Sequence, residues 1–275
     1  MTLQEYVDSL GGRRIAVLGM GVSNMPLIDL LLDNGHKICV CDMRSEEALG
    51  ETAGQLRERG AQLRLGPDYL EGLEDFDYIF RTPGLLPIDP ALVKAKERGA
   101  VITSEMEVFF RLCPCRTIGI TGSDGKTTTS SIIAELLKAA GKTVHLGGNI
   151  GKPLLCEIPS FGPDDIAVLE LSSFQLHSID IRPNVAVVTN VSPNHLDKHP
   201  DFDDYVNAKR QIFANQTAED VLVVNSDNAF TARFGEEAHS RVLRFSRKET
   251  LKNGVFCRNG MIYRSRGYEV ESIIP

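Results

Sequence analysis

The sequence has no tryptophan, no long apolar run and no excess of positive charge. Its 275 residues carry a formal net charge of -7, which argues against a protein that binds nucleic acid or an anionic membrane through bulk charge. No apolar segment is long enough to cross a bilayer, and residues 1–14 do not resemble a secretory signal. We therefore expect a cytoplasmic protein whose six cysteines are reduced thiols.

Apolar runs and helical patterns alternate in the first part of the chain. Short apolar runs predict strands, and apolar residues at three- and four-residue spacing predict helices. The expected strands lie at 14–18, 37–41, 77–80 and 101–102, and the expected helices at 25–32, 46–59 and 90–98. This order predicts a parallel sheet with helices on its faces.

A second series of the same kind begins near residue 115. Its expected strands lie at 116–120, 143–146, 166–171, 185–189 and 221–224, and its expected helices at 127–140 and 201–215. Asn259-Gly260 separates two strand-like runs, which is a strong signal for a β-hairpin. We therefore predict two α/β domains, residues 1–113 and 114–275, the second with a small antiparallel β addition near its C-terminal end.

The first glycine-rich loop, Gly19-Met-Gly-Val-Ser-Asn24, follows a predicted strand and precedes a predicted helix. This context suits a dinucleotide-type fingerprint, although asparagine stands where the third glycine is usual. Asp42 ends the next strand, where an acidic residue that binds a ribose hydroxyl is expected. The pattern favours a nucleotide or nucleotide-sugar site without separating NAD from UDP. A tight turn with a capping aspartate is the alternative.

The second glycine-rich loop lies in Thr121-Gly-Ser-Asp-Gly-Lys-Thr-Thr128, between a β-branched strand and a long helix. A standard phosphate-binding loop begins with a glycine where this chain has Ile120. Backbone N–H groups, the Lys126 ammonium and the Thr127 hydroxyl would still hold a triphosphate and its magnesium. We therefore expect a phosphate-binding loop that is tighter than the standard one.

Two further residues follow predicted strands. Glu170 ends the apolar strand Ile166-Ala-Val-Leu-Glu170, as does the acidic metal ligand of phosphate-loop enzymes. His195 lies in a proline-marked loop after the next strand, where α/β folds place ligands. The alternatives are a solvated glutamate and a structural or exposed histidine.

Lys209 falls within the apolar stripe of the helix expected at 201–215. A lysine on a buried face must extend its ammonium to solvent, pair with a carboxylate or lose its charge. Extension to solvent is the simpler alternative. A neutralised or modified lysine beside a metal site is the sharper hypothesis, because a lowered pKa makes the amine nucleophilic.

Five ordered motifs together resemble the Mur ligases of bacterial cell-wall synthesis. They are T-G-S-D-G-K-T-T (121–128), G-G-N-I-G (147–151), L-E-L-S-S-F-Q-L (169–176), S-P-N-H-L-D (192–197) and Y-V-N-A-K (205–209). G-M-G-V-S-N, Cys41-Asp-Met-Arg44 and Thr82-Pro-Gly84 are similar to the uridine-nucleotide domain of the branch that adds D-glutamate. The resemblance implies a Rossmann-like domain for the UDP-substrate, followed by a P-loop ATPase-like α/β domain.

The resemblance also implies an ATP-dependent ligase that joins D-glutamate to UDP-N-acetylmuramoyl-L-alanine through an acyl phosphate in peptidoglycan synthesis. It implies Thr127 and Glu170 on a first Mg²⁺, His195 on a second Mg²⁺, and a carbamylated Lys209 near both. Lys126, Glu170, His195 and Lys209 would then be catalytic. The residues expected to hold ATP are Ser123, Asp124, Gly125, Lys126, Thr127, Thr128 and Thr129. Those expected to hold the UDP-substrate are Gly19, Gly21, Val22, Ser23, Asn24, Asp42, Arg44, Gly84, Asn149, Ser172 and Gln175.

The chain departs from the family pattern in two ways. Asn194 stands where many members have aspartate, which makes the site less negative. Family members also carry a third, C-terminal domain that binds the amino acid, and we expect this chain to lack it and to end within an incomplete second domain. We expect a monomer with no nucleic-acid or membrane partner.

Three alternatives remain open. The first is a family ligase that adds another residue, such as L-alanine. The second is an NAD-binding oxidoreductase, which would leave the 121–128 loop, Glu170 and Lys209 without a role. The third is a nucleotide-binding module without catalysis.

Overall fold

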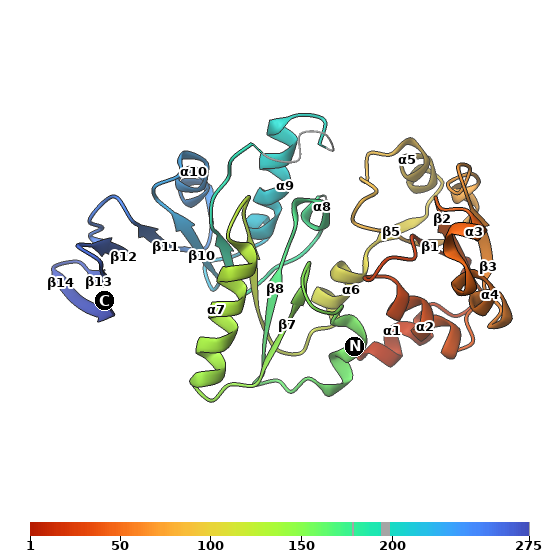
Figure 1. The fold of residues 1–275 in the computed structure, drawn as a ribbon, viewed down its shortest axis with the longest axis horizontal. Coiled ribbons are helices and arrows are strands. Elements are labelled where there is room, and N and C mark those ends of the chain that lie inside the picture. Colours follow the sequence, from red (N-terminus) through yellow and green to blue (C-terminus); the bar gives the residue numbers. More distant parts are fainter. Residues whose placement is uncertain (178, 194–198, 275) are drawn as a thin grey trace. The chain divides into compact units, whose positions relative to one another are not determined.

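The computed structural model describes residues 1–177, 179–193 and 199–274, and the chain divides into two compact units. The first unit contains Met1–Pro114 and Gly151–Gly162, and the second contains Cys115–Ile150 and Pro163–Pro275. Each has its own sheet with helices packed on it, so the expected α/β class is confirmed (Figure 1).

The first unit is built on a five-stranded parallel sheet in the order β3-β2-β1-β4-β5. The strands are β1 (Ile15–Leu18), β2 (Ile38–Asp42), β3 (Gln62–Leu65), β4 (Tyr78–Phe80) and β5 (Val101–Thr103). The helices are α1 (Leu3–Ser9), α2 (Met25–Asp33), α3 (Glu46–Leu49), α4 (Glu51–Glu58), α5 (Pro90–Glu97) and α6 (Glu105–Leu112), with 3-10 turns η1 (Leu73–Asp75) and η2 (Leu155–Ser160). Strand β3 was not expected, because its burial is only partial and its apolar pattern is weak. The single helix expected at 46–59 is wrong, since Gly50 has a φ of +55° and separates α3 from α4.

A segment from the middle of the chain, residues 151–162, groups with the first unit rather than with the range 114–275 expected for the second domain. Leu155 and Ile158 of η2 are buried, and the Phe161 ring lies edge-on to Phe109 of α6 at 6.2 Å. The Leu155 N–H donates to the buried Glu105 carboxylate at 3.1 Å. Such contacts join residues far apart in sequence, and periodicity does not reveal them.

The second unit contains a nine-stranded mixed sheet in the order β14-β13-β12-β11-β10-β9-β6-β8-β7. Its strands are β6 (Arg116–Thr121), β7 (Val144–Gly148), β8 (Ile166–Glu170), β9 (Val185–Val188), β10 (Val221–Asn225), β11 (Arg241–Ser246), β12 (Asn253–Arg258), β13 (Met261–Arg266) and β14 (Glu269–Ile274). Its helices are α7 (Lys126–Ala139), α8 (Ser173–Leu176), α9 (Phe202–Ala214) and α10 (Ala229–Glu237). Strands β12, β13 and β14 pair antiparallel, as the sequence predicts. Asn259 and Gly260 both have positive φ in the two-residue turn between β12 and β13, which is the geometry that favours these residue types.

Helices α7 and α9 cover opposite faces of this sheet. Ile120, Val168 and Val187 form an apolar cluster that packs against Ile133 and Leu137 of α7. The neighbouring β6 residue, Gly119, faces Ile212 of α9 instead. Successive strand residues point to opposite faces, so the alternation assigns one helix to each face. None of the helices in residues 1–177, 179–193 and 199–274 combines the length and apolar character needed to span a membrane.

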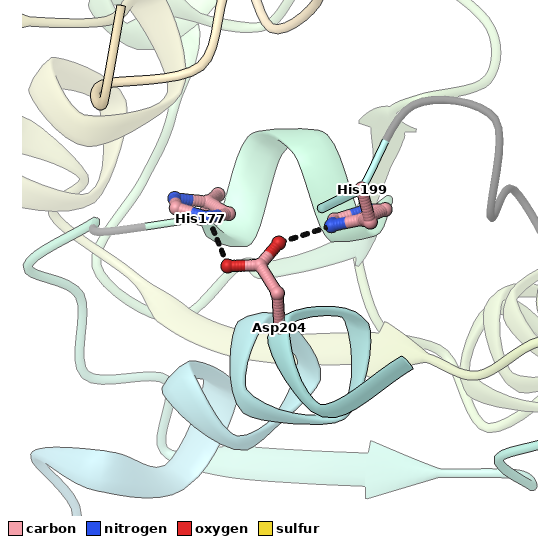
Figure 2. Close-up of side chains that lie close together, drawn as sticks. All are labelled: His177, His199 and Asp204. Atoms are coloured by element: carbon pink, nitrogen blue, oxygen red, sulfur yellow. Dashed lines mark hydrogen bonds and ion pairs between the residues drawn. The ribbon is translucent and has the colours of Figure 1, made fainter. Parts of the chain in front are cut away.

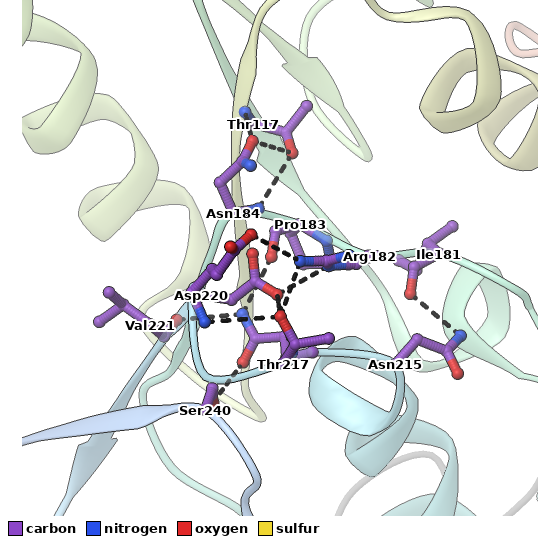
Figure 3. A network of polar contacts seen from close by, with 12 residues as sticks. Thr117, Ile181, Arg182, Pro183, Asn184, Asn215, Thr217, Asp220, Val221 and Ser240 are labelled. Carbon is purple, nitrogen blue, oxygen red and sulfur yellow. Dashed lines mark hydrogen bonds and ion pairs between the residues drawn. The ribbon is translucent and has the colours of Figure 1, made fainter.

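A polar network lies at the amino ends of β6, β9 and β10 (Figure 3). The Asn184 side chain accepts a hydrogen bond from the Thr117 N–H at 2.8 Å, and Arg182 Nε donates to the buried Asp220 carboxylate at 2.7 Å. Side chains therefore tie the strands together at this edge, and the opposite, carboxyl edge carries the loops where open α/β sheets bind ligands.

Candidate functional site

The loop between β6 and α7 has the strand–loop–helix arrangement expected of a phosphate site. Gly125 precedes the helix with a φ of +78°, which a residue with a side chain rarely adopts. Helix α7 starts at Lys126, so its first N–H groups and the positive end of its dipole face the loop. Asp124, Gly125, Thr127 and Thr128 are exposed, which leaves the loop open to a ligand. The binding role remains a prediction.

The loop is held in shape by residues that follow β9. Asn190 accepts from the Ser123 N–H through its carbonyl oxygen at 2.9 Å, and from the Asp124 N–H through its side chain at 3.0 Å. The Thr189 hydroxyl donates to the Asp124 carbonyl oxygen at 2.7 Å. A Cβ on Gly122 would overlap that hydroxyl, so the close approach requires glycine.

Tyr205 of α9 also supports the loop, and sequence reasoning missed this role. Its hydroxyl lies 2.9 Å from Ser123 Oγ, which in turn donates to the Ser192 carbonyl oxygen at 2.9 Å. Tyr205 is buried, as its place in the Y-V-N-A-K motif beside the apolar stripe of this helix fits, but neither feature indicates a contact with the loop. The sequence does contain a signal for the role of Thr189 and Asn190. These two polar residues directly follow an apolar strand, at the edge of the sheet where α/β folds bind ligands.

Glu170 lies beside the start of α7. Its two carboxylate oxygens accept hydrogen bonds from the Thr127 hydroxyl at 2.7 Å and from the Asn149 amide at 2.9 Å. Glu170 is 2% exposed, and the Asn149 N–H donates to its carbonyl oxygen at 2.8 Å. A Cβ on Gly148 would overlap that same oxygen, so β7 and β8 approach closely here. The structure thus brings three predicted residues together, and a hydroxyl and a carboxylate are ligands that suit Mg²⁺.

Two lysines meet at the phosphate loop. Lys126 Nζ donates to the Gly122 and Ser123 carbonyl oxygens, both at 2.9 Å. Lys209 Nζ donates to the same Gly122 oxygen at 2.8 Å. Lys209 is 1% exposed, so its ammonium does not extend to solvent. Burial and the nearby charge of Lys126 lower the pKa of Lys209 to about 7, and Asp124 opposes this shift. A substantial share of this amine is therefore neutral near pH 7.

Ser172 and Gln175, which were expected to contact the substrate, form the capping box of α8. The Ser172 hydroxyl accepts from the Gln175 N–H at 3.2 Å, and the Gln175 side chain accepts from the Ser172 N–H at 3.0 Å. Both follow Glu170 closely in the chain. His195 lies outside the described residues, so its predicted metal role stays a prediction.

In the first unit, Asp42 and Arg44 organise the first glycine-rich loop. Asp42 accepts from the Met20 N–H at 2.8 Å, and Arg44 donates to both of its carboxylate oxygens, at 2.9 and 2.8 Å. Burial by itself would raise the pKa of Asp42, but the hydrogen bonds from Arg44 and Met20 outweigh it and lower the pKa to about 2. Asp42 is therefore an anion that holds both the loop and Arg44. Its expected contact with a ribose hydroxyl stays a prediction.

Asn24, in the place of the third glycine, is 2% exposed and donates to the Leu18 carbonyl oxygen at 2.8 Å. It thereby ties the start of α2 to the end of β1. Gly21, Val22 and Gly84 are exposed, and Ser23 is half-buried. Gly19 has a φ of +85° and lies against Thr82. The expected UDP-site residues of the first unit thus gather at the carboxyl ends of β1, β2 and β4, whereas Asn149, Ser172 and Gln175 follow β7 and β8 of the second unit. The ligand role of both groups stays a prediction.

Comparisons with known proteins agree with these features. The family described as "Mur ligase middle domain" matches residues 120–273, and "Mur ligase MurD-like, N-terminal domain" matches residues 13–104. The chain belongs to the Mur ligase family. The phosphate loop, Glu170 and Lys209 all lie within the Mur ligase middle domain. The loop of residues 19–24 with Asp42 and Arg44 lies within the MurD-like domain.

Curated Mur ligases are similar over most of this chain. UDP-N-acetylmuramoylalanine--D-glutamate ligase of Clostridium novyi is 49% identical over 93% of the chain and 56% of its own length. The enzyme of the same name from Ruminiclostridium cellulolyticum is 45% identical over 99% of the chain and 58% of its own length. The chain thus spans little more than half the length of the curated relatives it matches.

Solved Mur ligase structures share the fold. A UDP-N-acetylmuramate:L-alanyl-gamma-D-glutamyl-meso-diaminopimelate ligase from Neisseria meningitides has a TM-score of 0.55 at 17% identity, covering 94% of this chain and 85% of that one. MurF from Acinetobacter baumannii has a TM-score of 0.52 at 15% identity, covering 99% of this chain and 60% of that one. At these identities the likeness concerns the fold.

Proposed function

We propose that this chain carries the UDP-substrate and ATP parts of a ligase that joins D-glutamate to UDP-N-acetylmuramoyl-L-alanine. The observation that carries the proposal is the Thr127–Glu170 contact of 2.7 Å beside a phosphate loop, in a chain 45–50% identical to ligases of that name. The first domain would bind the UDP group, and the second would bind ATP.

The reaction proposed has two steps. A carboxylate oxygen of the UDP-substrate attacks the γ-phosphorus of ATP, ADP leaves, and an acyl phosphate forms. The D-glutamate amine then attacks the acyl carbon, a proton leaves the nitrogen, and phosphate departs as the amide forms. Both partners of the first step are anions, so positive charge at the site must reduce their repulsion.

Lys126 and the loop N–H groups would bind the phosphates. Lys126 Nζ now donates to the Gly122 and Ser123 carbonyl oxygens, and it would exchange these for phosphate oxygens when ATP binds. Thr127 and Glu170 would hold one Mg²⁺, because a hydroxyl and a carboxylate oxygen fit this hard cation and already lie side by side. His195 would serve a second Mg²⁺. When bound, Mg²⁺ would supply charge that screens the two anions.

Lys209 would be carbamylated. The ammonium would first lose one proton, and the neutral amine would then add to carbon dioxide, forming an N–C bond, opening one C=O π bond and releasing a second proton. A buried cation would thereby become an anion. The lowered pKa of about 7 supports this, because only the neutral amine has the lone pair that reacts. The resulting carboxylate would attract the nearby cations and Lys126.

Calorimetry tests the proposal directly. We expect the chain to bind UDP-N-acetylmuramoyl-L-alanine and Mg·ATP at separate sites, and to show no heat with NADH. Binding of NADH without binding of the UDP-substrate would instead make the first unit a dinucleotide domain and overturn the proposal. A ligase that adds L-alanine would favour UDP-N-acetylmuramate over its alanyl form.

A further inference from the structure

Two histidines and one aspartate converge at the start of α9, apart from the residues assigned above (Figure 2). His177 Nε2 lies 2.9 Å from one Asp204 oxygen, and His199 Nδ1 lies 2.6 Å from the other. His177 caps the end of α8, His199 precedes α9, and Asp204 lies in the first turn of α9. These three ligand atoms lie within 4.8 Å of one another.

The surroundings hold both rings in place. His177 is 7% exposed and His199 is 3% exposed. The His199 ring stacks on Phe174 at 5.0 Å and meets Tyr205 edge-on at 5.2 Å. The Asp204 side chain is 24% exposed, so one side of the cluster is open to water and to an entering ion. Little reorganisation is needed to present three ligands to a common point.

We propose that His177 Nε2, His199 Nδ1 and the Asp204 carboxylate form a binding site for a divalent transition-metal ion of the Zn²⁺ type. Two imidazole nitrogens and one carboxylate are the donor set that Zn²⁺ and Co²⁺ accept readily, whereas Mg²⁺ prefers oxygen ligands. Three protein ligands leave a fourth position for water on the open side. The site is separate from the Thr127–Glu170 pair, so it does not depend on the proposed ligase function.

The hydrogen bonds around the cluster allow the proton rearrangement that metal binding requires. In the metal-free state, each histidine N–H donates to Asp204. The ion would need the lone pairs of these same nitrogens, so each ring proton would have to reside on the other ring nitrogen. For His199 that nitrogen, Nε2, lies 2.9 Å from the Ser173 hydroxyl, which is able to donate or to accept. A histidine whose second nitrogen binds an oxygen is the usual support of a metal ligand.

Asp204 adds the negative charge. Burial by itself would raise the pKa of this carboxyl, but the hydrogen bonds from His199 and His177 lower it below its ordinary value. The group is therefore ionised at neutral pH, as a ligand must be. A bound ion would fasten α8 to the first turn of α9, on the helix that also carries Tyr205 and Lys209.

Metal titration of the whole chain tests the site. Protein stripped with a chelator would be titrated with ZnCl₂ in excess Mg²⁺ and without nucleotide, and with CoCl₂ while visible absorbance is recorded. We expect one equivalent to bind, with a Co²⁺ absorption band typical of nitrogen ligation in a low-symmetry site. His177→Gln and Asp204→Asn should each weaken Zn²⁺ binding by more than about 10-fold. Loss of a residue that only supports a metal ligand already costs about 10-fold, and loss of the ligand itself should cost more.

His145→Gln is the matched control, because His145 lies 2.8 Å from Asp165 in a histidine–carboxylate pair outside the cluster. The His145→Gln variant should still bind one equivalent of Zn²⁺. Circular dichroism of the metal-free variants separates a lost ligand from a lost fold, and Asp204→Asn keeps an oxygen that can accept from a histidine. Absence of a Co²⁺ band in the parent chain, or Zn²⁺ binding that all three variants retain, would make the cluster a hydrogen-bonded network only and overturn the proposal.

Discussion

Lys126 and Lys209 donate to the same atom, the carbonyl oxygen of Gly122, at 2.9 and 2.8 Å. One lysine opens α7 and the other lies in the middle of α9, 83 positions apart in the sequence. Two ammonium groups around one oxygen repel each other, and this adds to the effect of burial on Lys209. The strain is relieved if Lys126 turns to phosphate oxygens or if Lys209 loses its charge.

The first prediction concerns the chemistry of Lys209. Incubation with ¹³C-labelled bicarbonate should give a carbamate signal by NMR that grows as pH rises through about 7, because only the neutral amine reacts. Lys209→Met should lose that signal. Lys138→Met, which removes an exposed lysine of α7, should keep it. A signal that survives in Lys209→Met would assign the carbamate to another residue.

The second prediction concerns stability. The pKa of Lys209 is about 7 in the folded chain against 10.5 ordinarily, so between these values the unfolded chain binds the extra proton and stability rises with pH. Below pH 7 the folded state carries the full cost of a buried ammonium. Lys209→Met should therefore stabilise the chain by about 1 kcal/mol or more at pH 6, and by less at pH 9. Urea unfolding at both pH values measures this, and an equal effect at the two would contradict the shifted pKa.

The third prediction concerns Glu170. Glu170→Gln keeps the size of the side chain but removes the charge beside Thr127, so Mg·ATP binding should weaken by about 10-fold or more. Binding of the UDP-substrate should change little. Calorimetry with each ligand separates the two effects, and Glu135→Gln on the exposed face of α7 is the control. Equal losses for both ligands would mean that Glu170 supports the fold and not the metal.

The fourth prediction concerns Gly122. Gly122→Ala would drive a methyl group into the Thr189 hydroxyl and displace the phosphate loop, which should abolish measurable ATP binding and lower Tm by several degrees. Gly54→Ala adds the same methyl in α4, where no atom lies within 4 Å, and should be neutral or slightly stabilising. Thermal melts and ATP titration check both variants. Normal ATP binding by Gly122→Ala would show that the loop tolerates a wider geometry.

The fifth prediction concerns Asp42. Its pKa is about 2, so its contribution to stability is complete above about pH 4 and is lost as pH falls through about 2. Asp42→Asn should release Arg44 and the 19–24 loop and weaken binding of the UDP-substrate. Asp77→Asn is a matched control, because Asp77 also has a pKa of about 2 and pairs with Arg14, but precedes β4 at the opposite edge of the sheet. If both variants bind the UDP-substrate as well as the parent chain, the carboxyl edge is not the uridine site.

Local sequence determined much of this structure because some signals span only a few residues. The β6–loop–α7 unit, the Asn259-Gly260 turn and the apolar stripe that buries Lys209 depend on spacing, glycine and β-branched residues within one element. Helix α9 begins and ends within one residue of the limits expected for it, since Asp201 caps its start. The same local signals were too weak for β3 and did not show the break between α3 and α4 at Gly50.

Tertiary structure alone decided which distant residues meet. Packing of β8 beside β6 brings Glu170 to Thr127, and packing of α9 beneath the loop brings Lys209 to Gly122. Packing of α9 beside α8 joins His177, His199 and Asp204. Packing of η2 on α6 places residues 151–162 in the first unit. These contacts depend on how complete elements bury their apolar faces against one another, a free energy summed over many residues that no short pattern contains.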